Sequence, residues 1–353
     1  MNKTHPLILL LTLAGASSCL FAADGDLSVS GTITSTGLTS APVFSTPVCR
    51  DGTGKLGNCA ADHPAKMATV AVNGGNYNSP LAAVSDLGNW CGVPSAANPC
   101  LIKVFPGLYD LGNTTLTLQY DYLDMAGSGS NVTTIRGQQS TAIVSVTGNA
   151  HIHDIAVENN SGAGYSATMK IDGASPQLAH VVLKSDSGTE NISQALKVIN
   201  GGHPQVNNSH LISLGRAGVV SLSVFDSSLD LYDSKLESLG SSGGNHDAIY
   251  LYNSNLTAHR SEFIGQAGIS ISMDNSGASP YKVTVEHSVV EGSPQAFSSG
   301  ASSSSIVSVA FADSKLTGVV GPVWTDPMIG DNYYPTCIGN YNGNFQALDY
   351  ACQ

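Results

Sequence analysis

Short apolar segments that alternate with polar residues recur along most of this chain, and many of them repeat a six-residue phrase. The phrase has an apolar residue at each end and a turn-forming pair in the middle, most often Asp-Ser or Asn-Ser. It occurs as VNNSHL at 206–211, LYDSKL at 231–236, AHRSEF at 258–263, VEHSVV at 285–290 and FADSKL at 311–316. Alternation with a period of two predicts short β-strands on both sides of each turn.

The last apolar residue of the phrase returns at a nearly constant interval. The series is Val157, Leu183, Leu211, Leu236, Phe263, Val290 and Leu316, with spacings of 26, 28, 25, 27, 27 and 26 residues. A period in the twenties indicates stacked supersecondary units. A second apolar strand precedes each phrase, as in AIVSV from residue 142 and AIYLY from residue 248. No amphipathic helix of ordinary length intervenes, which excludes βαβ units and leucine-rich horseshoes.

A coil of strands that climbs one strand spacing per repeat satisfies this pattern. In such a parallel β-helix, each residue lies about 4.8 Å from its counterpart one coil later. Asn and Asp tolerate left-handed backbone angles, so the polar pair bends the chain between two inward apolar residues. Seven such coils, with one or two more before residue 142, predict an all-β rod roughly 40 Å long.

The repeat apolar-x-Asn-x-x-apolar on this period resembles the right-handed parallel β-helix of the pectin lyase superfamily. The preceding segment is similar to the opening of pectinesterase-like members, with MATVAVNGGNYNSPLAAVSDLGNWC, LIKVFPGLYDLGNTTLTL and DMAGSGSNVTTIRG in order. The resemblance covers about residues 67–318 and implies a right-handed, single-stranded parallel β-helix closed by a short N-terminal capping helix. Ser79 followed by Pro80 suits the N-cap and first residue of that helix.

The chain divides by composition into four parts. We expect a signal peptide at 1–23, a Gly/Ser/Thr-rich leader at 24–65, the parallel β-helix at 66–318 and a C-terminal cap at 319–353. The apolar run behind Lys3 is too short to span a membrane and is typical of a secretory signal. A lipidated Cys19 is a weaker alternative. We therefore expect a secreted, periplasmic or extracellular-surface protein without a transmembrane segment.

The leader has two interpretations. Its segment GDLSVSGTITSTGL, from residue 25, resembles the stalk repeats of phage tail fibres and similar trimeric surface proteins. That resemblance implies a homotrimer formed through the leader. A flexible secreted leader is the alternative.

Six cysteines follow the signal segment and fall into three near-neighbour couples. We predict the disulfides Cys49–Cys59, Cys91–Cys100 and Cys337–Cys352. An even number of cysteines in an exported chain indicates disulfides formed in an oxidising compartment. A metal site is disfavoured, because the sequence has no C-x-x-C or Cys/His ligand spacing. The last couple would close the C-terminal cap.

Composition and charge narrow the range of binding partners and cofactors that we expect. Apolar residues make up 42% of the chain, charged residues only 11%, and glycine accounts for 38 positions, which suits a β-rich extracellular protein with many turns. The formal charge of −12 and the lack of a basic run argue against nucleic acid. Ca²⁺ requires six or more oxygen ligands, and no D-x-D-x-D loop offers them, so we predict no cofactor.

Catalytic signatures of the resembling enzymes are missing. The chain has no counterpart of the pectinesterase Gln-Asp-Thr turn, nor of the polygalacturonase Asp pair, and the P-G-L-Y motif at 106–109 is expected only to shape a turn. Asp247 is a weak catalytic candidate, with Asp233 as an acid from the coil below. Glycoside hydrolysis normally requires two carboxylates at a set separation.

An outward aromatic strip is the stronger candidate site. If Leu222, Val224, Ile249 and Leu251 point inward, alternation places Phe225, Tyr250 and Tyr252 outside on adjacent coils, with His246 beside them. Exposed rings beside hydrogen-bonding acids suit sugars, although a structural ladder under a loop is the alternative. The sequence therefore favours an exported, non-catalytic protein that binds polysaccharide or cell-surface glycans. The alternative is a divergent esterase, hydrolase or lyase acting on uronic-acid polymers.

Overall fold

The structure, a computed structural model, describes most of the chain from Lys66 onward. The gaps are 161–165, 187, 189–191, 216–217, 241–245, 273–280, 300–306, 322–323, 326–331, 334, 343, 345, 350–351 and 353. Residues 1–62 and 63–353 form two compact units.

In the first unit two short antiparallel pairs are described. They are β1 (Ala22–Ala23) with β2 (Asp26–Leu27), and β3 (Val48–Arg50) with β4 (Leu56–Asn58). Outside the described residues lie the predicted signal segment before Ala22, the predicted stalk segment beyond Leu27, and Cys59, the proposed partner of Cys49. Among the residues that are described, no helix is long and apolar enough to cross a bilayer.

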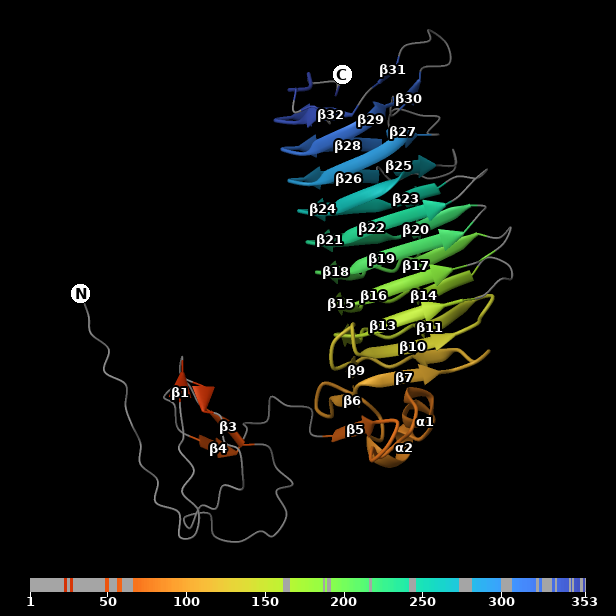
Figure 1. Cartoon of the computed structure of the whole chain (residues 1–353), viewed down its shortest axis with the longest axis vertical. Coiled ribbons are helices and arrows are strands. Elements are labelled where there is room, and N and C mark those ends of the chain that lie inside the picture. The colour runs from red at the N-terminus through yellow and green to blue at the C-terminus, as the bar shows by residue number, and fades with distance from the viewer. Residues whose placement is uncertain are drawn as a thin grey trace, which may run out of the picture. The chain divides into compact units, whose positions relative to one another are not determined.

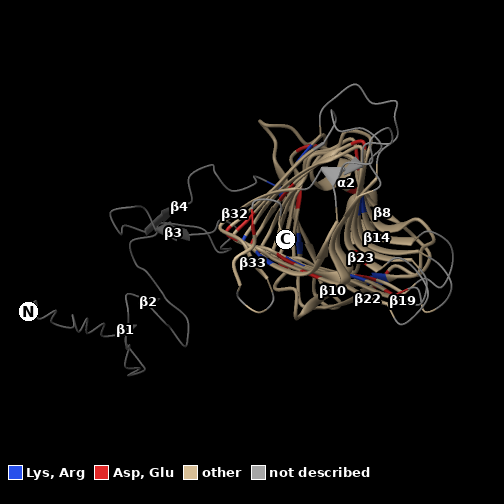
Figure 2. Ribbon diagram, turned by 90° about the horizontal axis from the view of Figure 1, so that it is seen from above, with Lys and Arg blue, Asp and Glu red and all other residues tan. Residues whose placement is uncertain are grey.

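The second unit is a parallel β-helix with three faces (Figures 1 and 2). The first face contains β5 (Lys66–Val70), β6 (Cys100–Val104), β9 (Leu123–Ala126), β12 (His151–His153), β15 (Gln177–Ala179), β18 (Gln205–Asn207), β21 (Ser228–Tyr232), β24 (Asn255–His259), β26 (Tyr281–Glu286), β28 (Val307–Ala312) and β32 (Thr336–Ile338). The second face contains β7 (Gly107–Asp110), β10 (Thr133–Gly137), β13 (Ala156–Asn159), β16 (Val182–Asp186), β19 (His210–Gly215), β22 (Lys235–Gly240), β25 (Glu262–Ser272), β27 (Val289–Ser299), β29 (Lys315–Val320) and β33 (Tyr341–Asn342).

The third face contains β8 (Leu116–Leu118), β11 (Ala142–Val146), β14 (Ser166–Asp172), β17 (Ser193–Ile199), β20 (Val219–Phe225) and β23 (His246–Tyr252), and the second half of β25 pairs with β23. β30 (Trp324–Thr325) and β31 (Asn332–Tyr333) form a separate antiparallel pair. In Figure 1 the near strands run left to right as the chain climbs, so the coil is right-handed, as the sequence resemblance implied.

The predicted apolar ladders form the core. Along the second face the successive partners are Val157, Leu183, Leu211, Leu236, Phe263, Val290 and Leu316. Along the first face they are Ile152, Leu178, Val206, Leu231, Ala258, Val285 and Phe311. All of these side chains are buried. The repeat therefore sets the register, because each coil places the same apolar positions inside.

The polar pair of the phrase forms the turn between the first and second faces. Asp154, His180, Asn208, Asp233, Arg260, His287 and Asp313 all have φ between 47° and 56°. The expected left-handed turn is thus confirmed at the Asp and Asn positions. The same conformation also occurs at two histidines and an arginine, where it is less favourable.

The serine of the phrase points inward and links the coils. The Ser234 hydroxyl accepts a hydrogen bond from the Ser209 backbone N–H at 3.1 Å and donates one to the Tyr232 carbonyl at 2.7 Å. The same pattern continues through Ser261 and Ser288. These serines are buried, so the row satisfies backbone groups that water does not reach.

Replacing Ser234 by Ala should lower the free energy of unfolding by about 1–3 kcal/mol, because the buried Ser209 N–H loses its partner. Urea unfolding of the variant would measure the loss. Ser145→Ala, on the outer side of β11, is the control and should change stability little. Equal effects at the two positions would contradict a structural role for the serine row.

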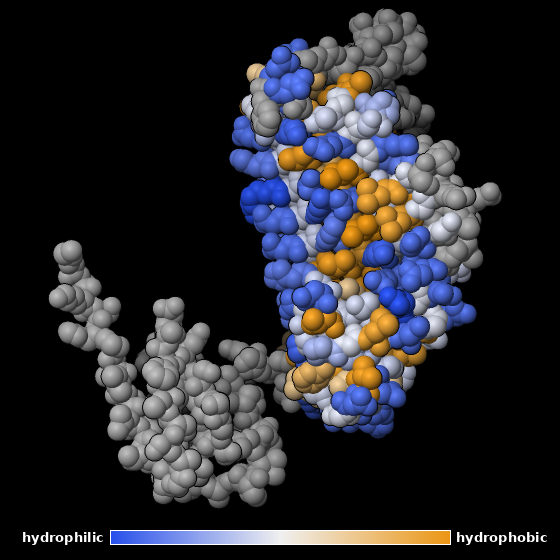
Figure 3. Space-filling model, in the orientation of Figure 1, coloured by the Kyte–Doolittle hydropathy of each residue, from blue (hydrophilic) through white to orange (hydrophobic). Residues whose placement is uncertain are grey.

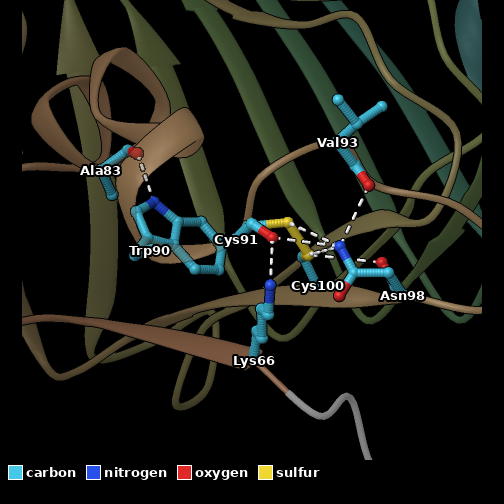
Figure 4. Close-up of a disulfide and its surroundings, with 7 residues drawn as sticks. All are labelled: Lys66, Ala83, Trp90, Cys91, Val93, Asn98 and Cys100. Atoms are coloured by element: carbon cyan, nitrogen blue, oxygen red, sulfur yellow. Dashed lines mark hydrogen bonds between the residues drawn. A yellow bond between two sulfur atoms is a disulfide. The ribbon is translucent and has the colours of Figure 1, made fainter.

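The N-terminal end is closed by two short helices, α1 (Pro80–Ser85) and α2 (Leu87–Trp90). The Ser79 hydroxyl caps α1 by accepting a hydrogen bond from Ala82 N–H at 3.1 Å. The predicted Cys91–Cys100 disulfide ties the end of α2 to β6, and Lys66 Nζ donates to the Cys91 carbonyl at 2.7 Å (Figure 4).

The C-terminal end is also tied by a disulfide. Cys337 and Cys352 are bonded, as predicted, and both are buried. Cys337 is in register with Phe311, so it continues the first-face ladder by one residue.

One expectation for the opening coils was wrong. Tyr109, which was expected only to shape a turn, lies in β7 in register with Ile135 and is buried. Its hydroxyl donates to the Phe105 carbonyl at 2.8 Å. The ring is therefore a core residue, because this strand continues the inner ladder of the second face.

Candidate functional site

Three aromatic rings gather on the outer side of the third face. Phe225 ends β20, and it is in register with Tyr252 of β23, while Tyr250 pairs with Ser223. The Phe225 ring centroid lies 5.8 Å from that of Tyr250 and 6.0 Å from that of Tyr252. The residues between them, such as Leu251, are buried in the core. The rings are half-buried and form one cluster across two coils, as alternation placed them.

Lys197 lies against this cluster from the coil below. Its Nζ is 5.5 Å from the centroid of the Phe225 ring, within the range of a cation–π contact. Burial, with a smaller contribution from the charge of Lys170, lowers the pKa of Lys197. Lys170 is paired with Asp172 at 2.9 Å, whereas no carboxylate of the described residues pairs with Lys197. A partly desolvated cation is thus available beside the rings.

Asp247 lies in β23, on the same face. Its side chain is only 5% exposed, and burial raises its pKa to about 6, although a hydrogen bond from the Ser270 hydroxyl opposes the shift. Ser270 is in register with Tyr250, which places this carboxyl group on the outer side near the rings. A carboxyl group with this pKa could exchange a proton near neutral pH.

Asp233, the acid proposed as the partner of Asp247, lies elsewhere, and so does Asp230 of the same coil. Asp233 is at the turn between the first and second faces, where Arg260 donates to both carboxylate oxygens at 2.6 Å. These bonds lower the pKa of Asp233. Asp230 faces His203 at 3.2 Å on the first face. Within the part of the chain that is described, no group of three or more His, Cys, Asp or Glu side chains is arranged to hold a metal ion.

His246 is not the surface residue that the sequence suggested. Its side chain is 1% exposed, and neither ring nitrogen has a hydrogen-bond partner among the described residues. Burial lowers its pKa. A Cβ atom at Gly240 would lie 2.0 Å from Nδ1, so the glycine makes room for the ring. Strict alternation fails here because β23 begins at a corner, where Ala248 and Ile249 are both core residues.

Sequence reasoning also missed Lys197 and the polar groups beside it. Gln194 Nε2 donates to the Ser223 hydroxyl at 2.9 Å, two coils below the equivalent Asp247–Ser270 contact. The repeat could have predicted that Lys197 lies near the rings, since Lys197, Ser223 and Tyr250 occupy equivalent outward positions on successive coils.

Comparison with known proteins gives remote similarities to solved structures. No protein-family model and no curated protein matches the chain. A pectin methylesterase from carrot is 13% identical, with a TM-score of 0.48 over 82% of this chain and 86% of that one. A pectin methylesterase from Aspergillus niger is 18% identical, with a TM-score of 0.43 over 80% and 87%. Pectate lyase Pel9A is 16% identical, with a TM-score of 0.44 over 78% and 70%.

Proposed function

We propose that this protein is exported and binds a polysaccharide or surface glycan, without cleaving it, on the outer side of its third face. The observation that carries the proposal is the cluster of Phe225, Tyr250 and Tyr252 on two adjacent coils, with Lys197 against it. Outward rings offer apolar area to the C–H face of a sugar, and the tyrosine hydroxyls can bond its edge.

Lys197 favours a glycan that carries carboxylate groups. It has no carboxylate partner among the described side chains, so a sugar acid could form a charge-assisted hydrogen bond with it. The net charge of −12 repels a polyanion at long range. Affinity would therefore depend on these short-range contacts. Export is supported by the two disulfides, which persist in oxidising compartments.

The triple variant Phe225→Ala, Tyr250→Ala and Tyr252→Ala should lose most of its glycan binding, because truncating central aromatic contacts typically costs about 2 kcal/mol or more. Calorimetry with the acidic glycans pectin and alginate would measure it. Tyr232→Ala is the matched control, since Tyr232 is a half-buried outward ring that stacks on His259 of the first face. Lys197→Met should weaken binding of the acidic glycans alone.

Two outcomes would contradict this proposal. One is wild-type protein that retains neither pectin nor alginate, and the other is a triple variant that binds them as well as wild type. A triple variant that loses stability in urea would show instead that the rings are structural.

The environment of Asp247 favours a second candidate function, a divergent enzyme acting on uronic-acid polymers. Its buried carboxyl group, with a pKa of about 6, resembles a general acid or base in protonation behaviour. Incubation with pectin and alginate would test this candidate through new reducing ends, unsaturated products or released methanol. Product formation that Asp247→Asn abolishes would replace the binding proposal with this one.

A further inference from the structure

A polar depression lies away from the aromatic cluster, at the corner between the first and second faces. There an open depression of about 550 Å³ crosses the turns of four successive coils and reaches Ser130 in a lower loop. This corner forms the left margin of the rod in Figure 3, which is predominantly hydrophilic.

The repeat itself produces the depression. Each left-handed turn residue sends its side chain outward, the next residue turns inward, and the residue after that points outward again. Asn208, Asp233 and Arg260 therefore form one line of outward side chains, and His210, Lys235 and Glu262 form a second line. The buried serines lie between the two lines and form the floor.

The walls are held in place by contacts between coils. Arg260 is fixed by its two bonds to Asp233. Lys235 Nζ lies 2.7 Å from Glu237 and 3.4 Å from Glu262, and His210 Nε2 lies 2.6 Å from Glu237. Side chains that are already ordered lose little conformational entropy when a ligand binds.

The residues that line the depression indicate which class of ligand would fit it. The volume is in the range of small-molecule sites, which are usually apolar, but this lining is mixed polar and contains no Phe, Tyr or Trp. The charges of Lys235 and Arg260 cancel those of Asp233 and Glu262. Such a surface offers alternating donors and acceptors without a net charge, which suits a polyhydroxylated, uncharged molecule and does not favour an acidic one.

We propose that this depression is a second carbohydrate site, which takes a neutral oligosaccharide segment lying along the rod axis. The inference goes beyond the proposed function, because it concerns a different face and a different class of sugar. The two sites would allow one molecule to hold an acidic and a neutral glycan at the same time.

The test uses the hexasaccharides of β-1,4-linked glucose, xylose and mannose with the full chain. The double variant Lys235→Ala and Glu262→Ala should weaken binding by about tenfold or more. Lys315→Ala is the matched control, since Lys315 occupies the equivalent position beyond the depression and pairs with Glu291 at 3.1 Å. Imidazole NMR signals of His180 and His210 should shift on binding, whereas that of His287 should not.

The results separate this proposal from the previous one. The aromatic triple variant should bind the neutral hexasaccharides as wild type does. The inference is overturned if none of the three sugars binds at millimolar concentration. It is also overturned if the control and the double variant lose affinity equally, or if only the aromatic variant loses it.

Discussion

Replacing Phe263 by Ala should lower the free energy of unfolding by about 3–5 kcal/mol, a large part of the 5–15 kcal/mol typical of a folded domain. The ring is fully buried in β25 and lies between Leu236 of the coil below and Val290 of the coil above. Truncation removes apolar contacts and leaves a cavity that two coils cannot close, because their backbones are held at the strand spacing. Urea unfolding would show a lower midpoint.

Leu239→Ala provides the control for this prediction. Leu239 is on the second face, in β22, but its side chain is 50% exposed, so its truncation should change stability much less. A lower denaturant slope for Phe263→Ala would indicate that coils on the two sides unfold separately. A loss below about 1 kcal/mol would contradict the inward ladder itself.

Replacing Asp247 by Asn should raise the free energy of unfolding by about 2–3 kcal/mol at pH 8 and change it little at pH 3. Burial raises the pKa of this carboxyl group to about 6, above its value in the unfolded chain. The group therefore contributes fully to stability below its unfolded pKa and loses that contribution as the pH rises through about 6. Asn removes the buried charge and keeps the shape.

Asp233→Asn is the control, because it should change the free energy of unfolding in the opposite direction. The bonds from Arg260 hold the pKa of Asp233 below its usual value, so its contribution is present at neutral pH and is lost as the pH falls. The variant should be less stable than wild type at pH 8 and equal to it at low pH. Unfolding curves for both variants at several pH values would check this, and parallel trends would show that Asp247 is not buried as described.

The ladders and turns could be predicted because they depend on one period. Val157 and Leu316 are six coils apart, and regular spacing alone identified every intermediate member of that row. The left-handed turns followed from the chemistry of Asn and Asp. Phe225, Tyr250 and Tyr252 were placed outside by strand alternation, which holds well in the middle and at the end of β20 and β23.

The site could be predicted only in part, because alternation fails at corners. At the start of β23 the chain bends, and this bend puts His246 inside and gives Asp247 its buried position. Lys197 was visible in the sequence only as one basic residue among several. Lys197 is a candidate binding residue because its Nζ lies over the Phe225 ring of the next coil and because no carboxylate among the described residues pairs with it. Such relations between coils are not contained in a single strand's pattern.

The main-chain bonds of this rod join each coil to the next, and like residues stack above like. A whole coil could therefore be duplicated or deleted during evolution without changing the interior of those that remain. Each such event would lengthen or shorten the molecule by about 4.8 Å. The aromatic cluster and the polar depression each extend over more than one coil, so an added or lost coil within either would change its length along the rod by one strand spacing.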